Sequence, residues 1–128
     1  MDNGSFQTRS PILLALQEAE EGTTGVIEVH LSRRWIERDA LARATEIFYQ
    51  FQMHRTQARN AVLVYVNFRA RKLAIIGDQG IHEAVGQGFW DRMSQELAEN
   101  LRYTQSERAI ALTVIAIGQV LKNFFPTL

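Results

Sequence analysis

The segment at residues 60–83 constrains the fold more than any other part of the chain. Residues 61–67 are β-branched and aromatic, and apolar on both alternating faces, which predicts a buried strand covered on both sides. Residues 73–76 are apolar in the same way, and the short connection between the two segments predicts an antiparallel hairpin. The sequence GDQG at 77–80 then predicts a turn, because glycine adopts backbone conformations that other residues resist.

The residues before the hairpin predict a helix, a strand and a second helix. Ser10 and Pro11 are typical of a helix start, with the serine as N-cap and the proline in the first turn. Residues 24–31 alternate between apolar and polar side chains, which predicts a half-exposed strand near an edge. A helix then ends near Gln52, so strand, helix and strand follow one another at the spacing of a parallel crossover.

The residues after the hairpin predict further helices. Apolar side chains recur at helical spacing over residues 89–101 and again over residues 110–124. Residues 104–107 match a capping box, in which Thr104 would begin the last helix. A sheet that is apolar on both faces needs cover on both, so the predicted fold class is α/β. We expect a three-layer α/β/α sandwich around a small mixed sheet.

Length and composition place limits on the class of protein. The chain has 128 residues, which predicts one domain, and the polar character of residues 1–9 predicts a flexible segment before it, so the domain is expected at 10–128. Its formal net charge of zero argues against nucleic-acid binding by bulk charge, and the absence of cysteine excludes thiol catalysis and thiolate zinc sites. No long apolar run and no secretory signal are visible, so we expect a soluble cytoplasmic protein.

Several motifs, in this order, resemble the TPM domain, a family formerly described as a domain of unknown function. They are TGVIEV at 24–29, MHRTQARNAVL at 53–63 and IGDQGIHE at 76–83. The likeness extends from Thr24 to about Pro126 and is greatest to a short, soluble bacterial branch of the family.

The resemblance implies an α/β/α sandwich, and it implies less about activity, because many members of the family have no assigned function. Some family members in photosynthetic membranes are described as acid phosphatases linked to photosystem repair, and some bind calcium near the sheet end. Bacterial members often lie beside the gene of a LemA-type membrane protein. This chain departs from the pattern at Arg59, where many members have an acidic residue, and at Ala61, which replaces a glycine. Arginine in place of a carboxylate weakens the implied calcium site.

The predicted topology brings the candidate functional residues to one end of the sheet. If the first two strands are parallel and the third is antiparallel, residues 77–80 emerge beside residues 54–60. The candidate ligand- or phosphate-binding residues there are His54, Arg55, Arg59, Asn60, Gly77, Gly80 and His82; Asp78 is the candidate catalytic residue, and Asp78 and Glu83 are the candidate metal ligands.

These residue types fit two interpretations. In a phosphatase, Arg55 and Arg59 would clamp phosphate oxygens, and the glycine turn would offer backbone N–H groups to the anion. Asp78 would hold a divalent cation, calcium or magnesium, or act as acid and base, while His54 or His82 would move protons. In the simpler interpretation, Asp78 only caps a short helix beginning at residue 79 and the arginines are solvated.

Three functions therefore remain open. The first is a non-catalytic interaction or ligand-binding module in membrane-protein maintenance, with a LemA-type or other membrane protein as partner. The second is a metal-assisted acid phosphatase acting on phosphomonoesters, and the third is a calcium-binding domain. The sequence shows no convincing catalytic constellation, which favours the first, and it does not indicate an oligomeric state.

A basic cluster is expected at the opposite end of the sheet. Its members are Arg33, Arg34, Arg38, Arg69, Arg71 and Lys72. The cluster is either a patch for acidic lipid headgroups or an acidic partner, or an ordinary set of solvated chain ends. The large aromatic side chains Trp35, Phe68 and Trp90 are expected in the core rather than in a recognition surface.

Overall fold

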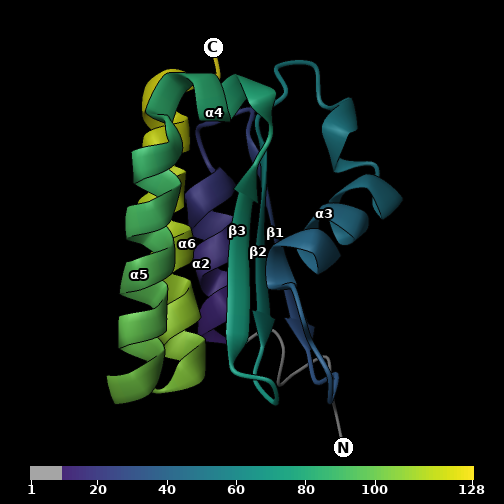
Figure 1. Cartoon of the computed structure of the whole chain (residues 1–128). Coiled ribbons are helices and arrows are strands. Elements are labelled where there is room, and N and C mark those ends of the chain that lie inside the picture. Colours follow the sequence, from purple (N-terminus) through teal and green to yellow (C-terminus); the bar gives the residue numbers. More distant parts are fainter. Residues whose placement is uncertain (1–9) are drawn as a thin grey trace, which may run out of the picture.

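A three-stranded sheet separates two layers of helices in the computed structural model, which describes residues 10–128 (Figure 1). The strands are β1 (Val26–Ser32), β2 (Ala61–Asn67) and β3 (Lys72–Gly77); the helices are α2 (Pro11–Glu20), α3 (Ala40–Gln50), α4 (Gln79–Val85), α5 (Gln87–Tyr103) and α6 (Ser106–Phe124), with a short 3-10 helix η1 (Met53–Arg55). Helices α2, α5 and α6 cover one face, and α3 covers the other. The predicted α/β/α sandwich is confirmed. The predicted flexible segment at 1–9 lies outside the described residues.

Strand β2 lies in the centre of the sheet, between β1 and β3. It pairs in parallel with β1, where Val26 lies opposite Ala61, and antiparallel with β3, where Val62 lies opposite Gly77. Every residue of β2 is buried, as the apolar character of both of its faces predicts. The pairing confirms the predicted mixed sheet and places β1 at an edge.

The two faces of β2 belong to two separate hydrophobic clusters. Val62, Val64 and Val66 pack with the residues of α2, α5 and α6. Leu63 and Tyr65 pack with α3 on the other face. Because successive side chains of a strand point to opposite faces, this one strand joins both halves of the core.

The helix starts follow the sequence in part. The Ser10 hydroxyl accepts a hydrogen bond from the N–H of Ile12, so the predicted N-cap of α2 is confirmed. The predicted capping box at 104–107 is wrong, because the N-cap of α6 is Gln105 and makes no side-chain cap bond. Glu107 instead accepts a hydrogen bond of 2.8 Å from Ser10 Oγ, which ties the first turn of α6 to the start of α2.

One of the aromatic predictions is wrong. Trp90 is 4% exposed and Phe68 is half-buried, but Trp35 is 78% exposed in the connection between β1 and α3. The core on the α3 face is filled from the helix and the sheet, so this connection passes outside it. Within residues 10–128, no helix is both long enough and apolar enough to cross a membrane.

Candidate functional site

The turn after β3 and the segment before β2 meet at one end of the sheet, as predicted from the topology. The N–H of Gly80 donates to the carbonyl oxygen of Arg59 at 2.8 Å, and the N–H of Asp78 donates to Ala61 at 2.9 Å. Antiparallel pairing of β2 with β3 produces this contact, because the last residues of β3 must lie beside the first residues of β2.

Asp78 and Arg59 form a bidentate ion pair at this end. Arg59 Nε lies 2.7 Å from Asp78 Oδ2, and Arg59 Nη2 lies 2.9 Å from Asp78 Oδ1. Asp78 is only 6% exposed, so both carboxylate oxygens are directed at the guanidinium rather than at solvent. The hydrogen bonds to Asp78, and then its negative charge, raise the pKa of Arg59 above its ordinary value.

The backbone N–H groups of the glycine turn are also engaged. The N–H of Gln79 donates to Asp78 Oδ1 at 2.8 Å, so Asp78 is the N-cap of α4. The N–H groups of Gly80 and Ile81 both donate to the carbonyl oxygen of Arg59. The backbone N–H groups that a phosphate would require are therefore already hydrogen-bonded within the chain.

Both glycines of the turn are required by close packing. A Cβ at Gly77 would overlap the ring of Trp90, and a Cβ at Gly80 would overlap the carbonyl oxygen of Ala58. Neither residue has a positive φ, so contact with neighbouring atoms and not backbone conformation explains them.

Of the imidazole and guanidinium groups predicted before β2, Arg59 pairs with Asp78, whereas His54 and Arg55 make their contacts elsewhere. The ring of His54 lies 5.0 Å from the ring of Tyr49, on the α3 side. Arg55 is exposed and donates to Gln52 Oε1 at 3.0 Å. Their predicted roles in phosphate binding stay predictions.

The candidates that follow the turn are engaged locally on α4 and α5. His82 Nδ1 accepts a hydrogen bond of 3.0 Å from Trp90 Nε1. Glu83 is exposed, and its Oε2 lies 3.4 Å from Gln79 Nε2. Asp78 and Glu83 are therefore bonded to different partners, and their role as a pair of metal ligands stays a prediction.

Asn60 is held beneath the turn. Its Nδ2 donates to Thr24 Oγ1 at 3.0 Å, which joins the start of β2 to the segment before β1. The residue is 1% exposed, and its Oδ1 has no hydrogen-bond partner. Within residues 10–128, no three or more His, Asp or Glu side chains are grouped so that they could hold a metal ion.

The opposite end of the sheet gathers the predicted basic cluster. The parallel register puts the end of β1 beside the hairpin, so the connections after β1 and β2 are neighbours. Asn67 Nδ2 donates to the carbonyl oxygen of Arg34 at 3.1 Å, and Lys72 Nζ donates to that of Arg38 at 3.3 Å. The guanidinium of Arg69 lies 3.9 Å from the centre of the Trp35 ring, as expected for a cation–π contact.

A buried carboxylate holds the β1–α3 connection in place. Glu37 accepts hydrogen bonds from the Tyr65 hydroxyl and from Asn67 Nδ2. Burial alone would raise the pKa of Glu37, but these hydrogen bonds and the charges of Arg34 and Arg43 outweigh it and lower the pKa. Burial, and then the bond to Glu37, raise the pKa of Tyr65.

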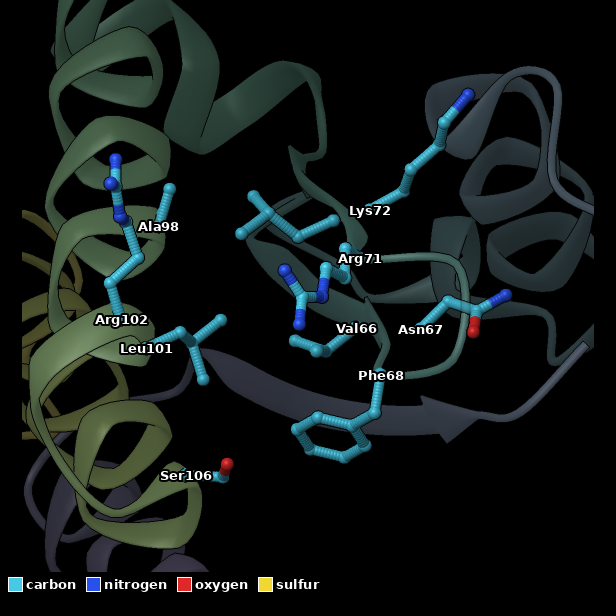
Figure 2. Close-up of a pocket in the computed structure, with 10 residues that line it drawn as sticks. Val66, Asn67, Phe68, Arg71, Lys72, Ala98, Leu101, Arg102 and Ser106 are labelled. Carbon is cyan, nitrogen blue, oxygen red and sulfur yellow. The ribbon is translucent and has the colours of Figure 1, made fainter.

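A cleft of about 610 Å³ lies between the hairpin and the junction of α5 with α6. Figure 2 shows Phe68, Arg71 and Leu101 around this cleft, and the Lys72 side chain extending away from it. Its basic groups are Arg71, Lys72 and Arg102, and no carboxylate lines it. Arg102 was not predicted in the basic cluster, because it lies far from the hairpin in sequence and only the packing of α5 against β3 brings it there.

Fold and turn together define the class: a small α/β/α domain with a mixed three-stranded sheet and an ion-paired glycine turn. A family model described as the TPM domain matches residues 5–120, and the chain belongs to that family. The chain is also similar to the BA42 protein of the psychrophilic bacterium Bizionia argentinensis sp. nov., solved by NMR. The two share 29% identity with a TM-score of 0.82, over 94% of this chain and 82% of that chain. A search of curated proteins found no match.

Proposed function

We propose that this TPM domain is a non-catalytic binding module that serves the maintenance of membrane proteins. The observation that carries the proposal is the Asp78–Arg59 pair, in which both carboxylate oxygens are bonded to one guanidinium. A catalytic carboxylate must reach the reacting group or its metal ion. Asp78 is buried, neutralised and used as a helix cap, so its contacts account for it as a structural residue.

The same pair argues against a divalent cation at this turn. The positive charge that calcium or magnesium would bring to Asp78 is already supplied by Arg59. An incoming cation would meet the guanidinium and would have to displace two charge-assisted hydrogen bonds. The calcium-binding and metal-assisted phosphatase alternatives are therefore less well supported than the binding module.

The kind of partner that we propose is based on the family to which the chain belongs, and not on the contacts of the glycine turn. Bacterial TPM proteins often lie beside the gene of a LemA-type membrane protein, so the partner we propose is a membrane protein of that type. The domain would meet it at the cytoplasmic side of the membrane.

A hydrolysis assay tests the non-catalytic part of the proposal. The purified protein should not turn over a generic phosphomonoester between acidic and neutral pH, with or without calcium or magnesium. Turnover that disappears in a folded Asp78→Asn variant would refute the proposal and place a catalytic site at the turn. Turnover unaffected by Asp78→Asn comes from a contaminant if a second purification removes it. If it persists through the second purification, it would also refute the proposal and place the catalytic site elsewhere in the protein.

Two further measurements test the metal and partner parts. A ligand that binds only the folded state raises the melting temperature. Because we propose that the domain does not bind calcium, millimolar calcium should leave its melting temperature unchanged, and a rise would contradict this part of the proposal. Cross-linking in the source cell should capture a membrane protein reproducibly. Capture of none, with both termini left free, would refute the partner class.

A further inference from the structure

Three chain connections lie together at the end of the sheet opposite the glycine turn (Figure 1). They are the β1–α3 connection, the β2–β3 hairpin and the α5–α6 junction, and we call them the hairpin end. The parallel register of β1 and β2 brings the first two together, and the cleft joins the hairpin to the third. Segments far apart in the sequence thus form one surface.

The hairpin end carries unusually exposed apolar side chains. Trp35 is 78% exposed, Tyr103 is 74% exposed and Ile36 is 72% exposed. Within residues 10–128 these are the most exposed large apolar side chains apart from the C-terminal Leu128. Scattered exposed apolar residues need no explanation, but the most exposed ones gathered at one end indicate a contact surface.

The same end is strongly basic in a protein with zero formal net charge. Its basic residues are Arg33, Arg34, Arg38, Arg69, Arg71, Lys72 and Arg102. The carboxylates in and next to these connections are Glu37, Asp39 and Glu107, so the seven basic groups outnumber the acidic ones. The arginine and lysine charges therefore dominate the field at this surface.

We propose that the hairpin end docks on a membrane surface that contains anionic phospholipids. Trp35 and Ile36 enter the interfacial region, and the basic side chains lie over the lipid phosphates. The cleft is lined by apolar side chains such as Phe68 and Leu101 and by the basic residues Arg71 and Arg102, a mixture that suits a phosphate headgroup with the first part of its acyl chains. This inference goes beyond the proposed function, because it concerns lipid and not a protein partner.

The combination of side chains favours a lipid surface over an acidic protein. Tryptophan and tyrosine prefer the membrane interface because they have an apolar body and a polar edge, and arginine beside them pairs with phosphate. Arg69 is stacked on Trp35, so the apolar ring and the cation are presented together. A polypeptide of acidic residues alone would use the charges and would leave Trp35 and Ile36 without an apolar partner.

Co-sedimentation with vesicles tests the proposal on the full chain. Binding should be strong with phosphatidylglycerol in phosphatidylcholine and weak with phosphatidylcholine alone. Salt of about 1 M should weaken it, because the screening length falls to about 3 Å. Each basic residue near an anionic surface contributes about fivefold in affinity, so Arg71→Gln with Arg102→Gln should weaken binding about 25-fold.

The insertion of apolar side chains has a separate test. Trp35→Ser with Ile36→Ser should weaken vesicle binding by at least about tenfold, and both residues are exposed enough for the fold to survive. Tryptophan emission should shift to the blue on vesicle addition in the parent chain, and Trp35→Phe should abolish the shift, since Trp90 is already buried. The matched controls at the other end are Phe124→Ser and Arg92→Gln, which should bind as the parent does.

Several outcomes would overturn the proposal. Equal binding to neutral and anionic vesicles, or equal binding by the Trp35 and control variants, would remove its basis. Binding of soluble glycerol phosphate without vesicle binding would show a site for small anions only. Binding of polyglutamate as tight as that of vesicles, with no change in Trp35 emission, would assign the surface to an acidic protein. None of these results bears on the phosphomonoester assay. The membrane-docking proposal can therefore be refuted while the proposed non-catalytic function stands, and the reverse is also true.

Discussion

Removing the Tyr65 hydroxyl should destabilise the protein in a way that depends on pH. The hydroxyl donates to Glu37 in a region where Tyr65 is 0% exposed and Glu37 is 8% exposed. A hydrogen bond to a charged group contributes about 1.5–3 kcal/mol, and without the hydroxyl Glu37 Oε1 keeps the hydrogen bond from Asn67 Nδ2 but loses this stronger share of its solvation. Tyr65→Phe should therefore lower the free energy of unfolding by about 2 kcal/mol at neutral pH.

This loss converts into a measurable change of melting temperature. Unfolding entropy is about 2.1 cal/mol/K per residue, which for 128 residues is about 0.27 kcal/mol/K. A loss of about 2 kcal/mol should then lower the melting temperature by about 7 °C in a thermal scan at pH 7. The control is Tyr49→Phe, where the residue is 54% exposed and the change should stay below about 2 °C.

The pH dependence identifies Glu37 as the source of the effect. The folded pKa of Glu37 is lowered from its ordinary value of 4.5, so its contribution is present above that value and is lost as the pH falls through the folded pKa. The difference between the parent and Tyr65→Phe should shrink over the same range. In a double-mutant cycle, Glu37→Gln should remove most of the effect of Tyr65→Phe. A loss below about 2 °C at pH 7, or one that is the same in acid, would refute the reasoning.

Two further predictions concern single residues. Gly77→Ala should destabilise the protein by more than about 2 kcal/mol, because the added Cβ would overlap the Trp90 ring. Gly88→Ala should stabilise α5 by about 0.5–1 kcal/mol, because no atom lies within 4 Å of the added Cβ. Chemical denaturation of both variants measures the two changes. Burial, and then the charge of Arg43, lower the pKa of His30 from 6.5, so part of the stability should be lost as the pH falls from 6.5 toward the folded pKa. His30→Gln should flatten the stability curve over that range, and an unchanged slope would contradict the assignment.

The arrangement of strands could be predicted because the signals are local. β2 is apolar at both alternating faces, and such a strand has to be central and covered on both sides. The hairpin has too short a connection to be anything but antiparallel, and the strand–helix–strand spacing before it requires a crossover. These rules bring residues 54–60 and the GDQG turn to one end of the sheet without any knowledge of the packing.

The pairing at that end could not be predicted, because it depends on side-chain direction. Sequence alone is compatible with Asp78 as a metal ligand or as a helix cap, and only the folded chain shows that Arg59 reaches both of its oxygens. The same holds for Trp35, which hydrophobicity assigns to the core. The hydrogen bonds of Tyr65 and Asn67 to Glu37 instead hold the β1–α3 connection outside the hydrophobic core, and Trp35 stays exposed.

The sequence by itself determined the layers, the order of the strands and the two ends of the sheet, because hydrophobic period and connection length act over a few residues. Tertiary structure alone decided which charges neutralise one another and which stay exposed. Arg59 is paired with Asp78 at one end, while Arg71 and Arg102 line the same cleft at the other end, because α5 packs against β3. Such pairings depend on distances of a few ångströms between segments far apart in the chain, and no local pattern encodes them.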